Sequence, residues 1–336
     1  MSDPFQTGRT VAPMFTNSHI GRRGAGICAA LAVLAATGLV AAWSVEVSSV
    51  IVTPTATSAA APKTLRVVRV RYGSTRHSWS YGWPVKPFDV QHPVRGFFND
   101  PRIGGGGGHA FHFGIDISAP DGTAVYAVEA GKVYFDSPRA IAVVALDRSH
   151  AFGYWHIVPV VRSHQTVAKH QLLGHIDKGW GHVHFAESWR KNYVNPLRNG
   201  GLGPYADHTA PTITAVELDS GDLVASAHDM PDTRVPGDWA DEPVSPALLR
   251  WRVVDADGSG TWRTAADFRS TMLPASEFTR IYTPATAQNH IRRPGQLWFY
   301  LARGWNRAAT DGSLAIEVRA TDTAGNSVTV SEDFGV

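Results

Sequence analysis

The sequence contains very little cysteine, because Cys28 is the only one among 336 residues. An intramolecular disulfide is therefore excluded, and the fold has to be stabilised by its hydrophobic cores. A zinc site made of thiolates is also excluded, since such sites use two or more cysteines. Any zinc ion bound by this chain must be held by histidine and carboxylate side chains.

An excess of charge of one sign is also missing. The 31 Lys and Arg residues nearly balance the 29 Asp and Glu residues, which leaves a formal net charge of +2 at neutral pH. Proteins that bind nucleic acid usually carry a basic patch or stripe, and no long basic run occurs here. The composition therefore predicts no nucleic-acid partner.

One long uncharged stretch occurs, close to the N-terminus. Residues 24–45 carry no charge and are rich in Ala, Leu and Val, and Arg9, Arg22 and Arg23 precede them. This asymmetry places the N-terminus in the cytoplasm and the rest of the chain outside. The stretch predicts a hydrophobic helix, which is either a membrane anchor, since ~20 residues span a bilayer, or a signal peptide cleaved near Val40-Ala41-Ala42. Both alternatives predict an extracytoplasmic protein, secreted or anchored in the membrane by this helix.

Long helical periodicity is absent from the rest of the chain, which shows short strand-like runs broken by Gly, Pro and Asp. Two stretches rich in residues typical of loops interrupt these runs. We therefore divide the chain into five parts: a cytoplasmic tail with the signal peptide or anchor (1–47), a linker (48–63), an antiparallel β domain (64–195), a second linker (196–210) and a C-terminal β domain (211–336).

The length and strand spacing of the C-terminal part suit a β-sandwich. Asp322-Thr323-Ala324-Gly325-Asn326 is a turn between its last two strand-like runs and predicts a hairpin. The ending resembles bacterial immunoglobulin-like modules, so we expect an immunoglobulin-like β-sandwich. Its five tryptophans could fill the sandwich core or line a sugar-binding face; these are Trp239, Trp251, Trp262, Trp298 and Trp305.

Two clusters stand out among the 15 histidines. His182 and His184 are two residues apart in a strand-like run, so their side chains project from the same face, with Cα atoms ~6–7 Å apart. His112 and Asp116 are four residues apart, which is ~13 Å on a flat strand and too far for both to reach one ion. We therefore predict a bend between them, at Gly114.

These motifs, their order and the sequence between them resemble the lysostaphin/LytM-type zinc peptidases, the M23 family. The resemblance covers about residues 95–190 and rests on four segments in order: His112-Phe113-Gly114-Ile115-Asp116, Gly122 to Val133, Tyr154-Trp155-His156, and His182-Val183-His184-Phe185-Ala186-Glu187. It implies a mostly β fold, in which an antiparallel LytM-type peptidase domain is followed by the immunoglobulin-like β-sandwich, with the N-terminal hydrophobic helix ahead of both.

Carried over residue by residue, the resemblance implies that His112, Asp116 and His184 bind Zn²⁺. It implies that His156 and His182 are catalytic histidines that do not bind the metal. Three protein ligands and one open position are typical of catalytic zinc. The expected activity is a zinc-dependent endopeptidase that hydrolyses stem or cross-bridge peptides of peptidoglycan, with peptidoglycan as its partner.

Several alternatives remain open at this stage. A structural zinc site could use four ligands, His112, Asp116, His182 and His184. The protein could be a non-catalytic M23-like regulator or binding protein of cell-wall hydrolases, or a peptidase of another extracellular substrate, such as an elastin-like or Gly-rich protein. Arg102 could bind a substrate carboxylate or form a salt bridge. Glu187, at odd spacing from His184, should point to the opposite face of its strand.

Overall fold

A computed structural model describes residues 65–334 except 74–77, 106–107, 255–256 and 306–314. The hydrophobic helix expected over 24–45 and the linker over 48–63 lie outside the described residues. Within the part that is described, no helix combines the length and the apolar character needed to cross a membrane. Residues 65–336 belong to one compact unit.

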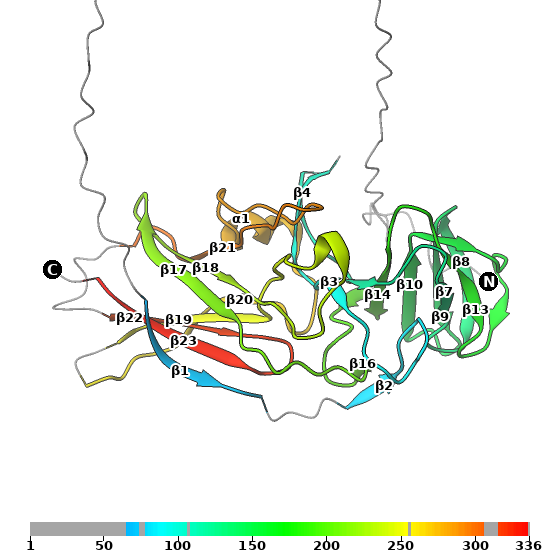
Figure 1. The fold of residues 1–336 in the computed structure, drawn as a ribbon, viewed down its shortest axis with the longest axis horizontal. Helices are drawn as coiled ribbons and strands as arrows, with labels where there is room; N and C mark the ends of the chain where they lie inside the picture. Colours follow the sequence, from blue (N-terminus) through cyan, green and yellow to red (C-terminus); the bar gives the residue numbers. More distant parts are fainter. Residues whose placement is uncertain (1–64, 74–77, 106–107, 255–256, 306–314, 335–336) are drawn as a thin grey trace, which may run out of the picture. The chain divides into compact units, whose positions relative to one another are not determined.

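The described chain is mostly β, as the sequence predicted (Figure 1). Its helical content among these residues is the short helix α1 (Phe278–Ile281) and two 3₁₀ turns, η1 (Gly237–Trp239) and η2 (Ala275–Glu277).

The largest sheet contains the strands that carry the predicted site. Its order is β12-β8-β9-β10-β14-β6-β3, with β15 paired to β14, and all of these pairs are antiparallel. Its strands are β3 (Val94–Gly96), β6 (Ile115–Ser118), β8 (Gly131–Ser137), β9 (Ala140–Ala145), β10 (His150–Trp155), β12 (Thr166–Val167), β14 (His182–Trp189) and β15 (Asn192–Val194). Every residue of β14 except Trp189 is buried, because this central strand is covered on both faces.

Three smaller sheets accompany it. One has the order β11-β13-β7, one pairs β4 with β5, and one pairs β16 with β2 in parallel. Their strands are β2 (Trp79–Tyr81), β4 (Pro101–Gly105), β5 (Gly108–Phe111), β7 (Ala124–Tyr126), β11 (Ile157–Pro159), β13 (Leu172–Ile176) and β16 (Gly201–Leu202).

The C-terminal part adds two further sheets, with the orders β1-β23-β22-β19-β20 and β17-β18-β21. Their strands are β1 (Arg66–Arg71), β17 (Thr212–Asp219), β18 (Asp222–His228), β19 (Leu248–Val254), β20 (Arg263–Asp267), β21 (Trp298–Ala302), β22 (Ala315–Thr321) and β23 (Ser327–Asp333). β22 and β23 form the hairpin that the turn at 322–326 predicted. The tryptophans of this part differ in solvent exposure, since Trp251 is buried in the core whereas Trp298 and Trp305 are partly exposed.

The first described strand joins the last one. β1 pairs with β23 in antiparallel fashion, with Arg66 opposite Ser331, and Figure 1 shows the two side by side. We expected residues 65–70 to pair with the strands that follow them, because they are close along the chain. Hydrogen bonding instead places this strand in the C-terminal sheet, so the strands of the largest sheet lie between two segments of that sheet in the sequence.

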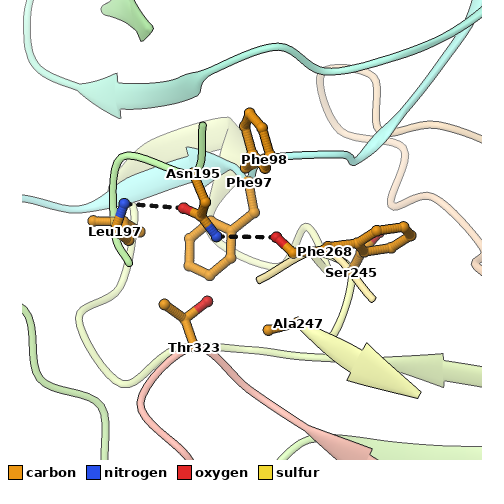
Figure 2. Close-up of a pocket in the computed structure, with 8 residues that line it drawn as sticks. All are labelled: Phe97, Phe98, Asn195, Leu197, Ser245, Ala247, Phe268 and Thr323. Atoms are coloured by element: carbon orange, nitrogen blue, oxygen red, sulfur yellow. Dashed lines mark hydrogen bonds between the residues drawn. The ribbon is translucent and has the colours of Figure 1, made fainter. Parts of the chain in front are cut away.

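Two hydrophobic cores share residues across the junction between the part that contains the largest sheet and the C-terminal part. Phe111 of β5 belongs to the C-terminal core, and Val244 belongs to the core of the largest sheet. Figure 2 shows a pocket at this junction, where Asn195 accepts a hydrogen bond from Leu197 N at 2.9 Å and donates one to Phe268 O at 3.2 Å. Asp100 accepts a further bond from Ser245 N at 2.8 Å. The junction is therefore packed and hydrogen-bonded, and it adjoins His112, whose backbone N donates to Asp100 O at 2.9 Å.

Candidate metal centre

A bend between two strands carries the first two site residues. β5 ends at Phe111 and β6 begins at Ile115, and Gly114 lies in a bend between them, as predicted. The position has no room for a side chain, because a Cβ on Gly114 would lie 2.9 Å from His184 Nε2 and even closer to Phe185 O. The bend brings His112 Nε2 to 3.2 Å from Asp116 Oδ1.

The central strand β14 carries the other two histidines of the motifs. It pairs with β6 so that His184 lies opposite Asp116, and with β10 so that His184 lies opposite Trp155. His182 and His184 project from the same face, since both reach Asp116 Oδ1, at 3.4 Å from Nε2 and 3.0 Å from Nδ1 respectively.

Three side chains converge on one point, as the sequence predicted. His112 Nε2 lies 2.8 Å from His184 Nδ1, and each nitrogen lies 3.0–3.2 Å from Asp116 Oδ1. Of the described residues, His112, Asp116 and His184 form a group whose possible ligand atoms all lie within 4.8 Å of one another. His182 is not a member of that group, which disfavours the alternative with four ligands.

The protonation states of these groups suit a metal ion. Burial lowers the pKa of His112 and lowers that of His184 to about 3, so both rings are neutral at ordinary pH. Burial raises the pKa of Asp116, but the imidazoles of His112 and His182 outweigh it and hold that pKa well below its usual range. His112 Nδ1 faces Phe97 O at 2.8 Å, which places the ring proton there and turns the Nε2 lone pair to the site. Two neutral imidazoles and one carboxylate are the donors that catalytic zinc sites use.

His156 and His182 lie together beside this group. Their ring centroids are 4.7 Å apart, and His156 stacks on Trp180 with centroids 3.6 Å apart. His156 adopts a left-handed backbone conformation with φ of 65°, which is uncommon for a residue with a side chain. Burial is the main cause that lowers the pKa of His156 to about 2, and the proximity of His182 and His184 lowers it further. The structure thus brings all five predicted site residues together.

Sequence reasoning missed Arg95, in β3. Its Nη2 lies 2.5 Å from His182 Nδ1 and donates to Trp180 O at 3.0 Å. Nδ1 of His182 therefore lies between the Arg95 guanidinium and Trp180 O, which is 2.8 Å away, and Nε2 of the ring faces Asp116. Arg95 belongs to no motif, and its approach depends on the strand order of the sheet. No signal in the sequence could have identified it.

The structure shows the contacts of Arg102 and Glu187, which the sequence alone left open. Arg102 donates to Asp116 Oδ2 at 3.0 Å, so it forms a salt bridge with the candidate metal ligand. Glu187 lies on the opposite face of β14, as expected, where Arg198 donates to its two oxygens at 2.6 and 2.7 Å and Tyr81 donates to one of them. Glu187 is fully buried. It supports the sheet and does not face the metal centre.

The structure combines a mostly β scaffold with a His-Asp-His group. This is the arrangement expected from the resemblance of the sequence to zinc peptidases. The profile of peptidase family M23 matches residues 110–196. The chain therefore contains an M23 metallopeptidase domain, with His112, Asp116 and His184 as its candidate metal site. No curated protein matches the chain.

Solved structures of other proteins are similar to parts of the chain. The catalytic domain of the antimicrobial peptidase lysostaphin from Staphylococcus simulans is 21% identical over 32% of this chain and 90% of its own, with a TM-score of 0.28. A zinc-containing peptidase from Vibrio cholerae is 23% identical over 35% of this chain and 39% of its own, with a TM-score of 0.29. Csd3 from Helicobacter pylori is 18% identical over 39% and 38%, with a TM-score of 0.30. The chain thus spans well under half the length of the last two, and the domain assignment rests on the family profile.

Proposed function

We propose that this protein is a zinc-dependent endopeptidase that hydrolyses peptide bonds of peptidoglycan, in stem or cross-bridge peptides, outside the cytoplasmic membrane. The observation that carries the proposal is the convergence of His112 Nε2, Asp116 Oδ1 and His184 Nδ1 within an M23 domain.

Zinc fits the donor set, because a buried group of two neutral imidazoles and one carboxylate retains a net charge of +1 with the ion. When bound, the ion polarises a substrate carbonyl and lowers the pKa of a water molecule to about 7. Arg102 supports this centre by holding Asp116 through its second oxygen, Oδ2, which leaves Oδ1 turned toward the two imidazoles.

The two remaining histidines supply the proton chemistry in this proposal. Arg95 and Trp180 O orient the His182 ring so that Nε2 faces the site, where the ring can stabilise the negative charge that develops on the attacked carbonyl oxygen. His156 stacks on Trp180 and lies beside His182, so one of its ring nitrogens can accept a proton and return it to the leaving amine.

The substrate class and the location rest on the sequence. The resemblance of the four motif segments to lysostaphin/LytM-type enzymes supports peptidoglycan as the substrate. The uncharged run over 24–45 supports export, with a cleaved signal peptide or a retained membrane anchor. We further propose that the two C-terminal sheets form an immunoglobulin-like module that positions the peptidase at the wall, since they pack around a shared core.

Digestion of purified cell walls by the purified protein tests this proposal. Zinc content is measured first, and the released fragments are identified by mass spectrometry. New amino and carboxyl termini within wall peptides are expected, and a chelator should abolish their release until zinc is restored. A zinc-loaded protein that releases no wall fragments but increases the activity of another hydrolase would instead be the regulator considered above.

A further inference from the structure

A cluster of three buried aspartates shares no residue with the candidate metal centre. Asp207 follows β16, Asp229 follows β18, and Asp322 follows β22, so the three residues come from three separate segments. All three are buried, with 5%, 1% and 2% of their surface exposed. They form a group in which one carboxylate oxygen from each residue lies within 4.8 Å of the others.

This cluster is uncompensated by positive charge. In the part of the chain that the structure describes, no Lys, Arg or His forms an ion pair with any of the three. Asp207 Oδ2 and Asp229 Oδ2 are buried without a hydrogen-bond partner in the described structure. Burying several unpaired carboxylates carries a large free-energy penalty, which a bound cation would remove.

The other carboxylate oxygens are held by hydrogen bonds that orient the cluster. Asp207 Oδ1 accepts from Thr209 N at 3.0 Å and from its hydroxyl at 2.7 Å. Asp322 accepts from Asn326 N at 2.7 Å and from its side-chain amide at 2.6 Å. These bonds fix the carboxylates while leaving an oxygen of Asp207 unused.

The hydroxyl of Tyr205 is an independent sign that a ligand binds here. It is buried, with 7% of the residue exposed, and it has no hydrogen-bond partner in the described structure. Burial raises the pKa of Tyr205 well above its usual value, and the nearby charges of Asp229, Asp207 and Asp322 raise it further. The hydroxyl therefore lies in the electrostatic field of all three carboxylates.

We propose that Asp207, Asp229 and Asp322 bind a hard divalent cation, and specifically Ca²⁺. Ca²⁺ prefers carboxylate oxygens at ~2.3–2.6 Å, so two oxygens bound to one ion lie at most ~5 Å apart, and one oxygen from each of the three residues satisfies this limit. The cluster contains no imidazole or thiolate, the ligands that favour zinc or copper. Mutual repulsion between three carboxylates favours occupation by a dication.

The cation would tie together parts of the fold that no disulfide can join. Asp207 belongs to the segment that follows β16, whereas Asp229 and Asp322 each directly follow a strand of one of the two C-terminal sheets. Asn326 already bridges these segments, since it donates to Asp207 O at 2.9 Å and accepts from Gly73 N at 2.7 Å. Bound Ca²⁺ therefore stabilises the junction of the peptidase and C-terminal parts.

Thermal unfolding of the purified protein during a CaCl₂ titration, with zinc kept constant, tests the proposal. A rise in Tm that grows with the logarithm of the Ca²⁺ concentration is expected, reaching roughly 5 °C at a hundredfold excess over Kd, with about one calcium ion bound per chain in equilibrium dialysis. Asp229→Asn and Asp322→Asn should lose this response. Asp219→Asn, on the exposed end of β17, is the matched control and should keep it.

Terbium luminescence gives a readout that does not depend on stability. Tb³⁺ bound to wild type or to His184→Ala should emit when the aromatic residues near the cluster are excited, and added Ca²⁺ should displace it and remove the emission. Asp229→Asn should show no Tb³⁺ emission. The proposal is overturned if wild type binds no Ca²⁺ in dialysis, or if the aspartate variants respond to Ca²⁺ as wild type does.

Discussion

The guanidinium of Arg95 lies 4.2 Å from the centre of the Trp239 indole ring, so a tryptophan of the C-terminal part covers an arginine that contacts His182. A stacked guanidinium loses freedom and keeps its hydrogen-bonding nitrogen aimed at the imidazole. The C-terminal part therefore contributes to the geometry of the peptidase site, in addition to any role in binding the wall.

Removing Trp239 should slow the reaction without removing the metal. A cation–π contact of this kind contributes ~0.5–2 kcal/mol, so Trp239→Ala should lower kcat/KM roughly 2- to 30-fold while zinc content stays unchanged. Trp262→Ala is the matched control, because Trp262 packs over Arg319 at 4.3 Å, away from the histidines. Equal activity of the two variants would show that Trp239 has no positioning role.

The division between metal ligands and catalytic histidines predicts two different losses. His184→Ala should lose zinc, because it removes one of three ligands. His182→Ala should keep zinc and lose turnover at least ~100-fold, the loss typical of removing one group that stabilises the oxyanion. Metal analysis and wall digestion measure both, with the exposed His208→Ala as control. Finding both variants free of zinc would refute this division.

Gly114 should tolerate no side chain. A Cβ there would lie 2.9 Å from His184 Nε2 and closer still to the backbone of Phe185, so Gly114→Ala should displace the ligand and reduce zinc affinity by at least tenfold. Gly122→Ala serves for comparison, since Gly122 has φ of 80° but open space around it. That variant should lose about 1–2 kcal/mol of stability and keep its zinc, because only backbone strain is added.

Arg198 should be essential for stability rather than for chemistry. Arg198→Ala leaves the fully buried carboxylate of Glu187 without its cation, and we expect a loss of about 3–5 kcal/mol in the free energy of unfolding. Arg269→Ala breaks an exposed pair with Asp267 and should cost less than ~1 kcal/mol. Chemical denaturation measures both, and similar losses would contradict the role assigned to Glu187.

Ionisation of the buried Glu242 carboxyl group should lower the free energy of unfolding as the pH rises toward neutral. Both of its carboxylate oxygens are buried without a hydrogen-bond partner in the described structure, and burial raises its pKa to about 7, opposed by the charge of Arg95. Between the ordinary pKa of 4.5 and this value, the folded state binds more protons than the unfolded state. The stability contributed by the neutral acid is therefore complete at low pH and lost as the pH rises through 7.

Glu242→Gln should remove this pH-dependent part of the unfolding free energy. The difference in unfolding free energy between variant and wild type should grow by on the order of 2–3 kcal/mol from pH 4.5 to 8. Glu217→Gln, on the exposed side of β17, should give a constant difference over the same range. Parallel profiles for wild type and Glu242→Gln would contradict the raised pKa.

Local patterns were sufficient to predict part of this protein. The two-residue spacing of His182 and His184 requires a shared face on any strand, and the four-residue spacing of His112 and Asp116 requires a bend, which Gly114 permits. The odd spacing of Glu187 likewise placed it on the opposite face. These predictions succeeded because the pleat of a strand is a local property of the backbone.

The sequence by itself determined a mostly β chain without disulfides, the motif of an M23 peptidase and the identity of the candidate metal ligands. Only the tertiary structure decided that β1 pairs with β23, that Arg95 contacts His182, and that Asp207, Asp229 and Asp322 meet. Each of these contacts joins segments far apart in the chain. Their proximity follows from strand order and core packing, and no local periodicity encodes either of them.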